Sequence, residues 1–220
     1  MIYQSVNQAV FRRIPSTTRR LLDIGCGGGV FGAAVKEMLP CTVVGVTYSE
    51  DEARQARQRI DWVEVADLNH FDPATLGWFD CIVCSHVLEH LADPQQVLSR
   101  LRHCLAPGGT LLVALPNVLF WKQRLQFLRG RFRYTEGGLM DRTHLRFFDG
   151  HSAASLVRAS GFDVRECSAD GIFPLSRVLG QTCSSWVNRR ALSLWPGVFG
   201  VQFVMVGGLA SAGASSGEAR

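Results

Sequence analysis

The sequence predicts an α/β protein whose mostly parallel sheet is covered by helices on both faces. Three observations support this fold class. Short apolar runs rich in β-branched residues alternate with longer amphipathic segments, as in a doubly wound sheet. The runs are almost continuously apolar, as expected for strands that are buried on both faces. Four glycines lie among residues 25–29, where the first run meets the first amphipathic segment, and such junctions bind ligands in this fold class.

Turn and capping residues separate the elements along the chain. Pro40 ends the first helix, and Ser49 with Glu52 forms a capping-box pattern at the start of the second. Asp93 and Pro94 begin a further helix, with Asp93 as the expected cap. The expected strands are residues 21–24, 42–46, 62–65, 79–85, 110–115, 162–167 and 200–206. The expected helices are residues 30–39, 50–59, 94–105 and 150–160.

The alternation of strand and helix changes after Pro116. Residues 118–149 are basic and aromatic and do not resemble another strand–helix unit. We therefore expect a single domain over residues 1–210, with a lid insertion at about 118–149. The small, polar residues 211–220 are expected to form a flexible tail.

Composition places the chain among globular proteins, since 47% of its residues are hydrophobic and 19% are charged. The net charge of +4 is mild and does not by itself indicate nucleic acid. Seven scattered cysteines suit a reducing compartment, so we expect a cytoplasmic protein, and the start of the chain lacks a signal-peptide pattern. On one strand, Cys81 and Cys84 would point to opposite faces rather than form a metal or redox pair. Residues 191–217 carry no charge, but Pro196 and several glycines interrupt them, so we expect a buried strand and no membrane span.

The glycine-rich turn indicates which ligand the fold binds. Gly25, Gly27 and Gly29 are spaced as G-x-G-x-G, but Val30 occupies the position where a dinucleotide fingerprint needs its last glycine. A phosphate-binding P-loop is also excluded, because no Gly-Lys-Ser/Thr follows. Asp23, two residues before the first glycine, would repel a pyrophosphate and attract a ligand with an ammonium and a sulfonium. S-adenosylmethionine is such a ligand.

Four motifs in order resemble the class I S-adenosylmethionine-dependent methyltransferases. They are the D-x-G-x-G-x-G stretch at residues 23–29, the adenine-side segment 65–68, the fourth-strand segment 79–90 and the Pro-Gly-Gly-strand-Pro-Asn segment 105–117. The chain is most similar to UbiG-like and MetW-like small-molecule branches. Residues 116–131 resemble the MetW type, and the DRTHLRFF stretch at 141–148 resembles methyltransferases found beside polysaccharide genes.

The resemblance implies a Rossmann-like, seven-stranded sheet in the order 3-2-1-4-5-7-6 with one antiparallel strand. It also implies S-adenosylmethionine as cofactor and S-adenosylhomocysteine as product. The cofactor residues it assigns are Asp23, Gly25, Cys26, Gly27, Thr47, Tyr48, Asp67, Leu68, Ser85 and His86. The family usually has an acid that holds the ribose hydroxyls where this chain has Thr47, and Glu50 is a candidate substitute.

Three histidines are candidate bases for methyl transfer to oxygen, because imidazole titrates near neutral pH. His144 is the first choice, since it lies in the expected lid, followed by His90 and His86. A metal site of Glu89, His90 and His144 is an alternative, because RNA 2′-O-methyltransferases of the small-RNA 3′-end kind use a similar Glu-His pair and a later His. The second glutamate of that pattern is replaced by His86, so we expect no metal.

The expected lid carries arginines and aromatics that can bind an acceptor. Arginine suits two-point contacts with phosphate or carboxylate, so the acceptor is expected to be small and anionic. The candidate substrate-binding residues are Trp121, Arg124, Arg142 and Arg146. An amphipathic helix with its arginines in solvent explains residues 119–130 equally well.

The sequence therefore predicts a methyltransferase that acts on a small acceptor, at oxygen, in a biosynthetic pathway such as that of a sugar, polysaccharide or secondary metabolite. Two alternatives stay open. One is an RNA or nucleotide methyltransferase, which the modest net charge disfavours. The other is a non-catalytic, MetW-like regulatory partner of a biosynthetic enzyme. A homodimer or a partner enzyme also remains open.

Overall fold

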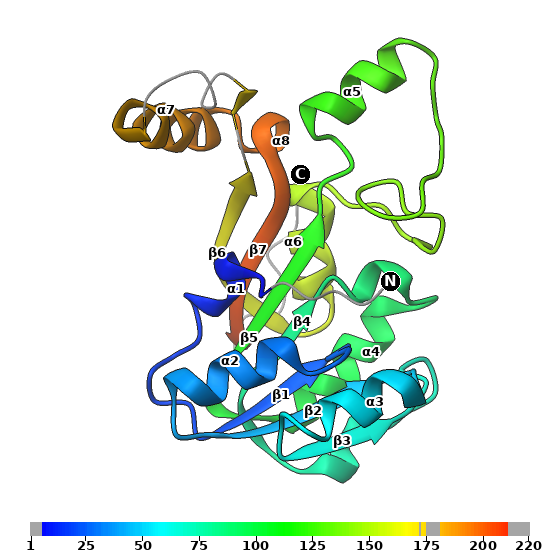
Figure 1. Cartoon of the computed structure of the whole chain (residues 1–220), viewed down its shortest axis with the longest axis vertical. Helices are drawn as coiled ribbons and strands as arrows, with labels where there is room; N and C mark the ends of the chain where they lie inside the picture. The colour runs from blue at the N-terminus through cyan, green and yellow to red at the C-terminus, as the bar shows by residue number, and fades with distance from the viewer. Residues whose placement is uncertain (1–5, 172, 175–180, 211–220) are drawn as a thin grey trace.

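The computed structural model describes residues 6–171, 173–174 and 181–210, so the expected tail at 211–220 lies outside the described residues. Seven strands form one sheet in the order β3-β2-β1-β4-β5-β7-β6 (Figure 1). The strands are β1 Arg20–Ile24, β2 Thr42–Thr47, β3 Trp62–Val65, β4 Phe79–Ser85, β5 Leu105–Pro116, β6 Phe162–Gly171 and β7 Gly200–Leu209. Strands β1 to β5 pair in parallel, whereas β7 is antiparallel to both β5 and β6. The predicted fold class and strand order are confirmed.

Helices connect the strands, and α3 and α4 begin at the predicted capping residues Ser49 and Asp93. They are α1 Gln8–Phe11, α2 Val30–Met38, α3 Glu50–Ala56, α4 Pro94–Leu101, α5 Trp121–Leu128, α6 Gly150–Ala159, α7 Gln181–Leu194 and α8 Pro196–Phe199. Short 3₁₀ turns are η1 Pro73–Leu76, η2 Leu88–His90 and η3 Arg102–Cys104. Asp93 accepts a hydrogen bond from the Gln96 amide at 2.9 Å and so caps α4.

The N-terminus of α3 differs from the expected capping box. The Ser49 hydroxyl accepts from the Glu52 amide at 3.3 Å, as predicted. The Glu52 carboxylate does not reach back to the cap, because it accepts a hydrogen bond from the Thr47 hydroxyl instead. Helix α3 also ends at Ala56, three residues earlier than expected.

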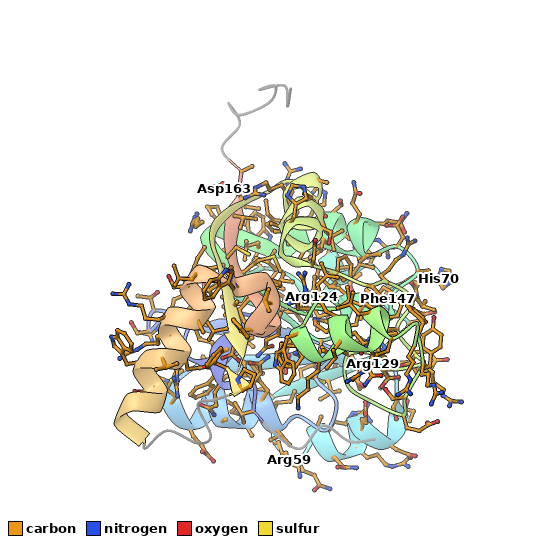
Figure 2. The ribbon with its side chains drawn as sticks, turned by 90° about the horizontal axis from the view of Figure 1, so that it is seen from above. Arg59, His70, Arg124, Arg129, Phe147 and Asp163 are labelled. Atoms are coloured by element: carbon orange, nitrogen blue, oxygen red, sulfur yellow. The ribbon has the colours of Figure 1, made fainter. Side chains whose placement is uncertain are left out.

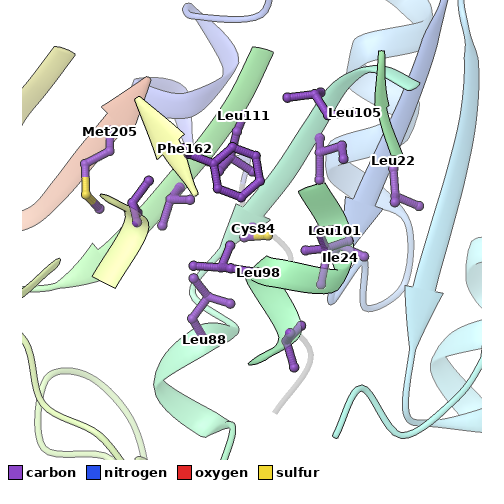
Figure 3. Packing of buried hydrophobic residues seen from close by; sticks show 14 of the residues in the cluster. Leu22, Ile24, Cys84, Leu88, Leu98, Leu101, Leu105, Leu111, Phe162 and Met205 are labelled. Atoms are coloured by element: carbon purple, nitrogen blue, oxygen red, sulfur yellow. The ribbon is translucent and has the colours of Figure 1, made fainter. Parts of the chain in front are cut away.

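Two hydrophobic layers cover the sheet. Val10 of α1, Val35 of α2 and the alanines of α3 pack on one face, while α4 and α6 pack on the other (Figure 1). Figure 3 shows part of the second layer, including Leu98 and Leu101 of α4. Cys81 and Cys84 are free thiols in opposite layers, which confirms that they do not form a pair.

The segment after β5 crosses the carboxyl end of the sheet. Helix α5 lies beyond the arrowhead of β5 in Figure 1, and an irregular stretch then leads to α6. Strand β5 begins at Leu105 rather than at residue 110, with a register shift against β4, so the Gly108–Gly109 turn is part of the strand.

The uncharged stretch before residue 210 forms the buried strand that the sequence predicts. Strand β7 is preceded by α7 and α8, which the sequence analysis left unassigned. Among the residues that the structure describes, no helix combines the length and hydropathy that crossing a membrane requires.

Candidate active site

A cavity of about 1550 Å³ opens at the carboxyl ends of β1, β2 and β4. The sequence places its walls there, because the chain leaves each of these parallel strands at the same edge of the sheet. All of the predicted cofactor residues line it: Asp23, Gly25, Cys26, Gly27, Thr47, Tyr48, Asp67, Leu68, Ser85 and His86. We call this wall the cofactor half of the cavity.

The glycines after β1 have two different reasons to lack a side chain. Gly25 has a φ of +76°, and a Cβ there would lie 2.8 Å from the Val87 side chain, so its neighbour leaves no room. Gly27 also has a positive φ, +51°, but the nearest atom to its hypothetical Cβ is Glu52 Oε1 at 4.0 Å. The backbone at Gly27 therefore faces open cavity and is free for close approach by a ligand.

Asp23 is a buried carboxylate that faces the cavity without a partner. Its side chain comes from β1, the residue is 4% exposed, and Oδ2 has no hydrogen-bond partner among the described residues. Burial raises its pKa to about 7. A cationic group of a ligand would satisfy this oxygen and favour its ionised form.

Glu52, together with Thr47, provides the carboxylate that is missing from the end of β2. Thr47 ends β2 and donates a 2.8 Å hydrogen bond from its hydroxyl to Glu52 Oε2, and both residues line the cavity. Glu50, the substitute suggested by the sequence, is exposed and lies 3.5 Å from Arg57 in an ion pair, away from this cavity. Glu52 therefore supplies the carboxylate beside Thr47.

Asp67 both shapes its own turn and lines the cavity. Its Oδ1 accepts hydrogen bonds from the backbone and side-chain nitrogens of Asn69, at 2.9 and 2.8 Å. These bonds hold the pKa of Asp67 below its usual value. The second oxygen lies 3.9 Å from His70.

His86 follows β4 in a conformation that few residues adopt. It is the one non-glycine residue with a positive φ, 54°, in the described part of the chain. Its Nε2 lies 2.8 Å from Gln202 Oε1, and its Nδ1 lies 3.3 Å from Glu89 Oε1. Burial lowers the pKa of His86, but Glu89 and Gln202 outweigh that effect and raise it above the usual value.

His144 lies beneath the cavity wall rather than on it. The residue is 6% exposed, and its Nε2 is 4.0 Å from Glu89 Oε1. Burial is the main cause that lowers the pKa of His144, and the neighbouring His90 adds to it. His90, whose ring centroid is 4.8 Å from that of His144, lines the cavity together with His86.

A polar network that the sequence analysis missed lines the other half of the cavity, which we call the acceptor half. Gln202 of β7 donates to Asp170 Oδ2 at 2.8 Å and to Asn7 Oδ1 at 3.2 Å. Asn7 in turn donates to Ser85 Oγ at 3.1 Å. The partners are 32 to 195 residues apart in sequence, so no local sequence pattern predicts these contacts.

The structure separates the predicted substrate residues. Arg142 lines the cavity and forms a 2.7 Å ion pair with Glu136. Arg124, on α5 in Figure 2, donates to the Leu119 and Gly197 carbonyls, and Arg146 donates to the Ala92 carbonyl. The indole nitrogen of Trp121 is buried and without a hydrogen-bond partner in the described structure. Arg124, Arg146 and Trp121 do not line the cavity, and the two arginines instead bind backbone carbonyls.

Comparison with known families agrees with this geometry. A family model described as a methyltransferase domain matches residues 4–167, well over half of the chain. The chain belongs to the class I S-adenosylmethionine-dependent methyltransferases. In this methyltransferase, the matched region contains the glycine loop, β4 and the segment of His144.

Individual relatives align over different shares of their length. A ubiquinone biosynthesis O-methyltransferase from Thiobacillus denitrificans is 25% identical over 80% of this chain and 78% of its own. An uncharacterized transposon TN4556 protein from Streptomyces fradiae is 38% identical over 44% of this chain, but over only 30% of its own length. The crystal structure of a S-adenosylmethionine-dependent methyltransferase from Archaeoglobus fulgidus superposes with a TM-score of 0.66, at 20% identity over 90% of each chain.

The cofactor of this family fits the residues that are present. The unpartnered oxygen of Asp23 can pair with a cation, and the methionyl end of S-adenosylmethionine carries an ammonium. The space beside Gly27 admits the ligand, and the Thr47–Glu52 pair offers oxygen acceptors for hydroxyl groups.

Proposed function

We propose that this methyltransferase transfers a methyl group from S-adenosylmethionine to an oxygen atom of a small acceptor. The main supporting observation is that the residues of the cofactor half and the histidines after β4, His86 and His90, line one continuous cavity. Its volume of about 1550 Å³ exceeds the range of roughly 300–1,000 Å³ for a single-ligand site, which leaves room for an acceptor beside the cofactor. The ubiquinone biosynthesis O-methyltransferase among the relatives supports oxygen as the receiving atom and a biosynthetic role.

Each residue of the cofactor half has a proposed role. Asp23 binds the ammonium, and the backbone at Gly25 and Gly27 lies against the methionyl part. Glu52, held by Thr47, accepts hydrogen bonds from the ribose hydroxyls. Asp67 contacts the adenine amine with Leu68 beside the ring, while Cys26 and Tyr48 complete the wall.

Catalysis in this proposal depends mainly on orientation. When bound, the cofactor supplies an electrophilic methyl group on sulfur. Ser85 and His86, at the end of β4, mark where the two halves of the cavity meet. The acceptor oxygen approaches there in line with the sulfur–carbon bond, which an enzyme achieves by holding both molecules fixed. As the carbon–sulfur bond breaks and the carbon–oxygen bond forms, the proton of the acceptor hydroxyl passes to water at the edge of the cavity lined by His86 and His90.

An anionic acceptor is the finer part of the proposal. Three arginines line the acceptor half, and two of them already pair with carboxylates: Arg13 with Glu166 at 2.6 Å and Arg142 with Glu136 at 2.7 Å. Arg12 is exposed on the same wall and is the arginine we assign to the acceptor. The free cysteines of the described residues support a reducing, cytoplasmic location.

The first experiment measures binding of S-adenosylhomocysteine by calorimetry to the wild type, Gly27→Arg and Gly138→Arg. Both glycines have a positive φ and open space around a hypothetical Cβ, but only Gly27 lines the cavity. We expect Gly27→Arg to abolish binding and Gly138→Arg to retain it. Unchanged binding by Gly27→Arg would show that the cofactor does not bind at the glycine loop.

The second experiment identifies the reaction by mass spectrometry of small hydroxylated acids and neutral analogues incubated with S-adenosylmethionine. The proposal expects methyl ethers, with acids preferred over neutral analogues, and expects Arg12→Gln to reduce that preference. Methylation of nitrogen or carbon alone would contradict it. Binding of cofactor without methylation of any acceptor until a partner enzyme is added would favour the regulatory alternative.

One observation favours RNA as a second candidate acceptor. Arg129, Arg131 and Arg133 are exposed in the insertion, interleaved with the exposed rings of Phe132 and Tyr134. A basic and aromatic surface of this kind suits single-stranded nucleic acid. RNA binding that weakens steeply with salt, together with methylation of the bound RNA, would establish this candidate.

A further inference from the structure

We propose that Glu89, His90 and His144 bind a divalent transition metal whose open coordination position faces the cavity. Glu89 and His90 belong to the turn η2 after β4, and His144 comes from the insertion. One ligand atom from each residue lies within 4.8 Å of the others. Two imidazoles and one carboxylate form a ligand set that is found in catalytic zinc sites.

Glu89 supplies the first reason to infer a cation. Its side chain is 1% exposed, and neither carboxylate oxygen has a hydrogen-bond partner among the described residues. His86 Nδ1 lies 3.3 Å from Oε1, so this oxygen is close to a group that can carry a positive charge, whereas Oε2 has no partner among the described residues. A buried carboxylate is stable only when it is paired, hydrogen-bonded or bound to a metal, so the unpartnered oxygen favours a bound cation.

The orientation of the two imidazoles supplies the second reason. His144 Nδ1 lies 3.3 Å from the Leu139 carbonyl oxygen. His90 Nδ1 lies 3.3 Å from the Thr143 carbonyl oxygen and 3.1 Å from Thr143 Oγ1. A carbonyl partner fixes the proton on Nδ1 in both rings and leaves Nε2 as the atom with a free lone pair. Metal-binding histidines have this arrangement, in which the second ring nitrogen donates to a carbonyl or carboxylate.

The insertion is attached to η2 in a way that preforms the site. The amides of Leu145 and Arg146 both donate to the backbone carbonyl of Glu89, at 2.8 and 3.1 Å. The Asp141 carboxylate accepts from the Thr143 amide and hydroxyl, at 2.8 and 2.7 Å, and so orients the partner of His90. The backbone thus places His144 against Glu89 before any ion binds.

The types of ligand atom indicate which metal binds, and the burial of the three ligand residues indicates where its open coordination position lies. Imidazole suits Zn²⁺, Co²⁺ and Ni²⁺, whereas Mg²⁺ prefers oxygen ligands and water. Glu89 and His144 are buried, and His90 lines the cavity, so the open position lies on the His90 side. Resting on the proposed methyl transfer, we assign that position to the acceptor oxygen, whose deprotonation a bound cation favours.

The test titrates the metal-free, full-length protein with Co²⁺ and follows the visible absorption of the bound ion. The variants are Glu89→Gln and His144→Gln, and the control is His103→Gln, which changes an exposed histidine at the opposite end of the sheet. We expect one equivalent of Co²⁺ to bind to the wild type and to the control, and Zn²⁺ to displace it. Because loss of even an outer-sphere partner weakens metal affinity roughly 10- to 100-fold, each ligand variant should weaken it at least that much. Equal Co²⁺ affinity in wild type and Glu89→Gln, or binding of Mg²⁺ in preference to both metals, would overturn the proposal.

Two further measurements separate this inference from the proposed function. Glu89→Gln keeps the shape of the side chain and removes a buried charge, so it should fold, and its binding of S-adenosylhomocysteine should match the wild type. Zn²⁺ should raise the melting temperature of the wild type but not of this variant. Metal binding without methylation of any acceptor would refute only the proposed function. Methylation that persists in chelator, with no Co²⁺ spectrum, would refute only the metal site.

Discussion

The hydroxyl of Thr47 donates a 2.8 Å hydrogen bond to the carboxylate of Glu52, across the junction between β2 and α3. Thr47 stands where the family usually carries an acid, and Glu52 comes from the first turn of the next helix. Both residues line the cofactor half of the cavity. The carboxylate that the strand lacks is thus supplied by a side chain five residues later.

Replacing Glu52 by Gln should weaken binding of S-adenosylhomocysteine roughly 10- to 100-fold, because a hydrogen bond to a charged group contributes about 1.5–3 kcal/mol. Glu50→Gln is the matched control, since Glu50 lies in the same helical turn but is exposed outside this cavity. Calorimetry on the two variants and the wild type measures the difference. Equal losses in both variants would remove Glu52 from the ribose site.

Affinity for the cofactor should rise with pH until Asp23 is ionised. Burial raises the pKa of Asp23 to about 7, and the ammonium of the ligand binds only the ionised carboxylate favourably. Below that pH, a proton must leave for each ligand bound, so affinity should fall about tenfold per pH unit. Calorimetry with S-adenosylhomocysteine between about pH 5 and pH 8.5 tests this dependence. Asp23→Asn should bind weakly with no such slope, and a flat wild-type profile would contradict the assignment.

Asp23→Asn should also make the ligand-free protein more stable at alkaline pH. The pKa of Asp23 in the folded protein, about 7, lies above the value of about 3.9 expected in an unfolded chain. The folded state therefore holds this proton more tightly, and the free energy of unfolding of the wild type falls as pH rises from about 4 to 7. Chemical denaturation at pH 5 and pH 8 should show the advantage of the variant growing with pH. An advantage that shrinks with pH would show that Asp23 is already ionised and stabilised in the folded protein.

Asn117→Ala should destabilise the protein by about 2–4 kcal/mol, because it leaves several buried backbone groups without partners. Asn117 is fully buried at the end of β5. Its amide donates to the carbonyls of Gly197 and Gly200, at 3.0 and 2.8 Å, and its oxygen accepts from the Leu119 amide at 3.0 Å. Denaturant unfolding measures the change. A loss below about 0.5 kcal/mol, typical of surface positions, would show that these bonds are replaceable.

The sequence and its family resemblance predict residues that the structure brings together in the cofactor half, except that Glu52 rather than Glu50 lies beside Thr47. Asp23 and Gly27 follow from the glycine-rich turn and from the rule that parallel strands end at one edge of the sheet, whereas the family resemblance implies Ser85. The sequence also groups Glu89, His90 and His144 as an alternative metal site, although it predicts no metal. Backbone hydrogen bonds between distant segments bring Glu89 and His144 together in the structure.

The acceptor half could not be predicted in the same way. Asn7 and Gln202 are 195 residues apart, and neither lies in a motif. For Arg124 and Arg146 the sequence predicted a role that the structure does not show. Their positive charge suggested binding of an anionic ligand, but each side chain donates to a backbone carbonyl. A side chain's type restricts its chemistry, but its partner depends on tertiary packing.

The position of β7 between β5 and β6 has a consequence for how the chain folds during synthesis. Strand β6 ends at Gly171 and lies at the edge of the sheet, next only to β7, which begins at Gly200. A nascent chain that has emerged only as far as β6 thus has nowhere to dock that strand, and β5 presents an unpaired edge, which is prone to aggregation. The pairing of β5, β7 and β6 can form only after residues beyond 200 have left the ribosome. A chaperone that shields the β5 edge would therefore act before that point.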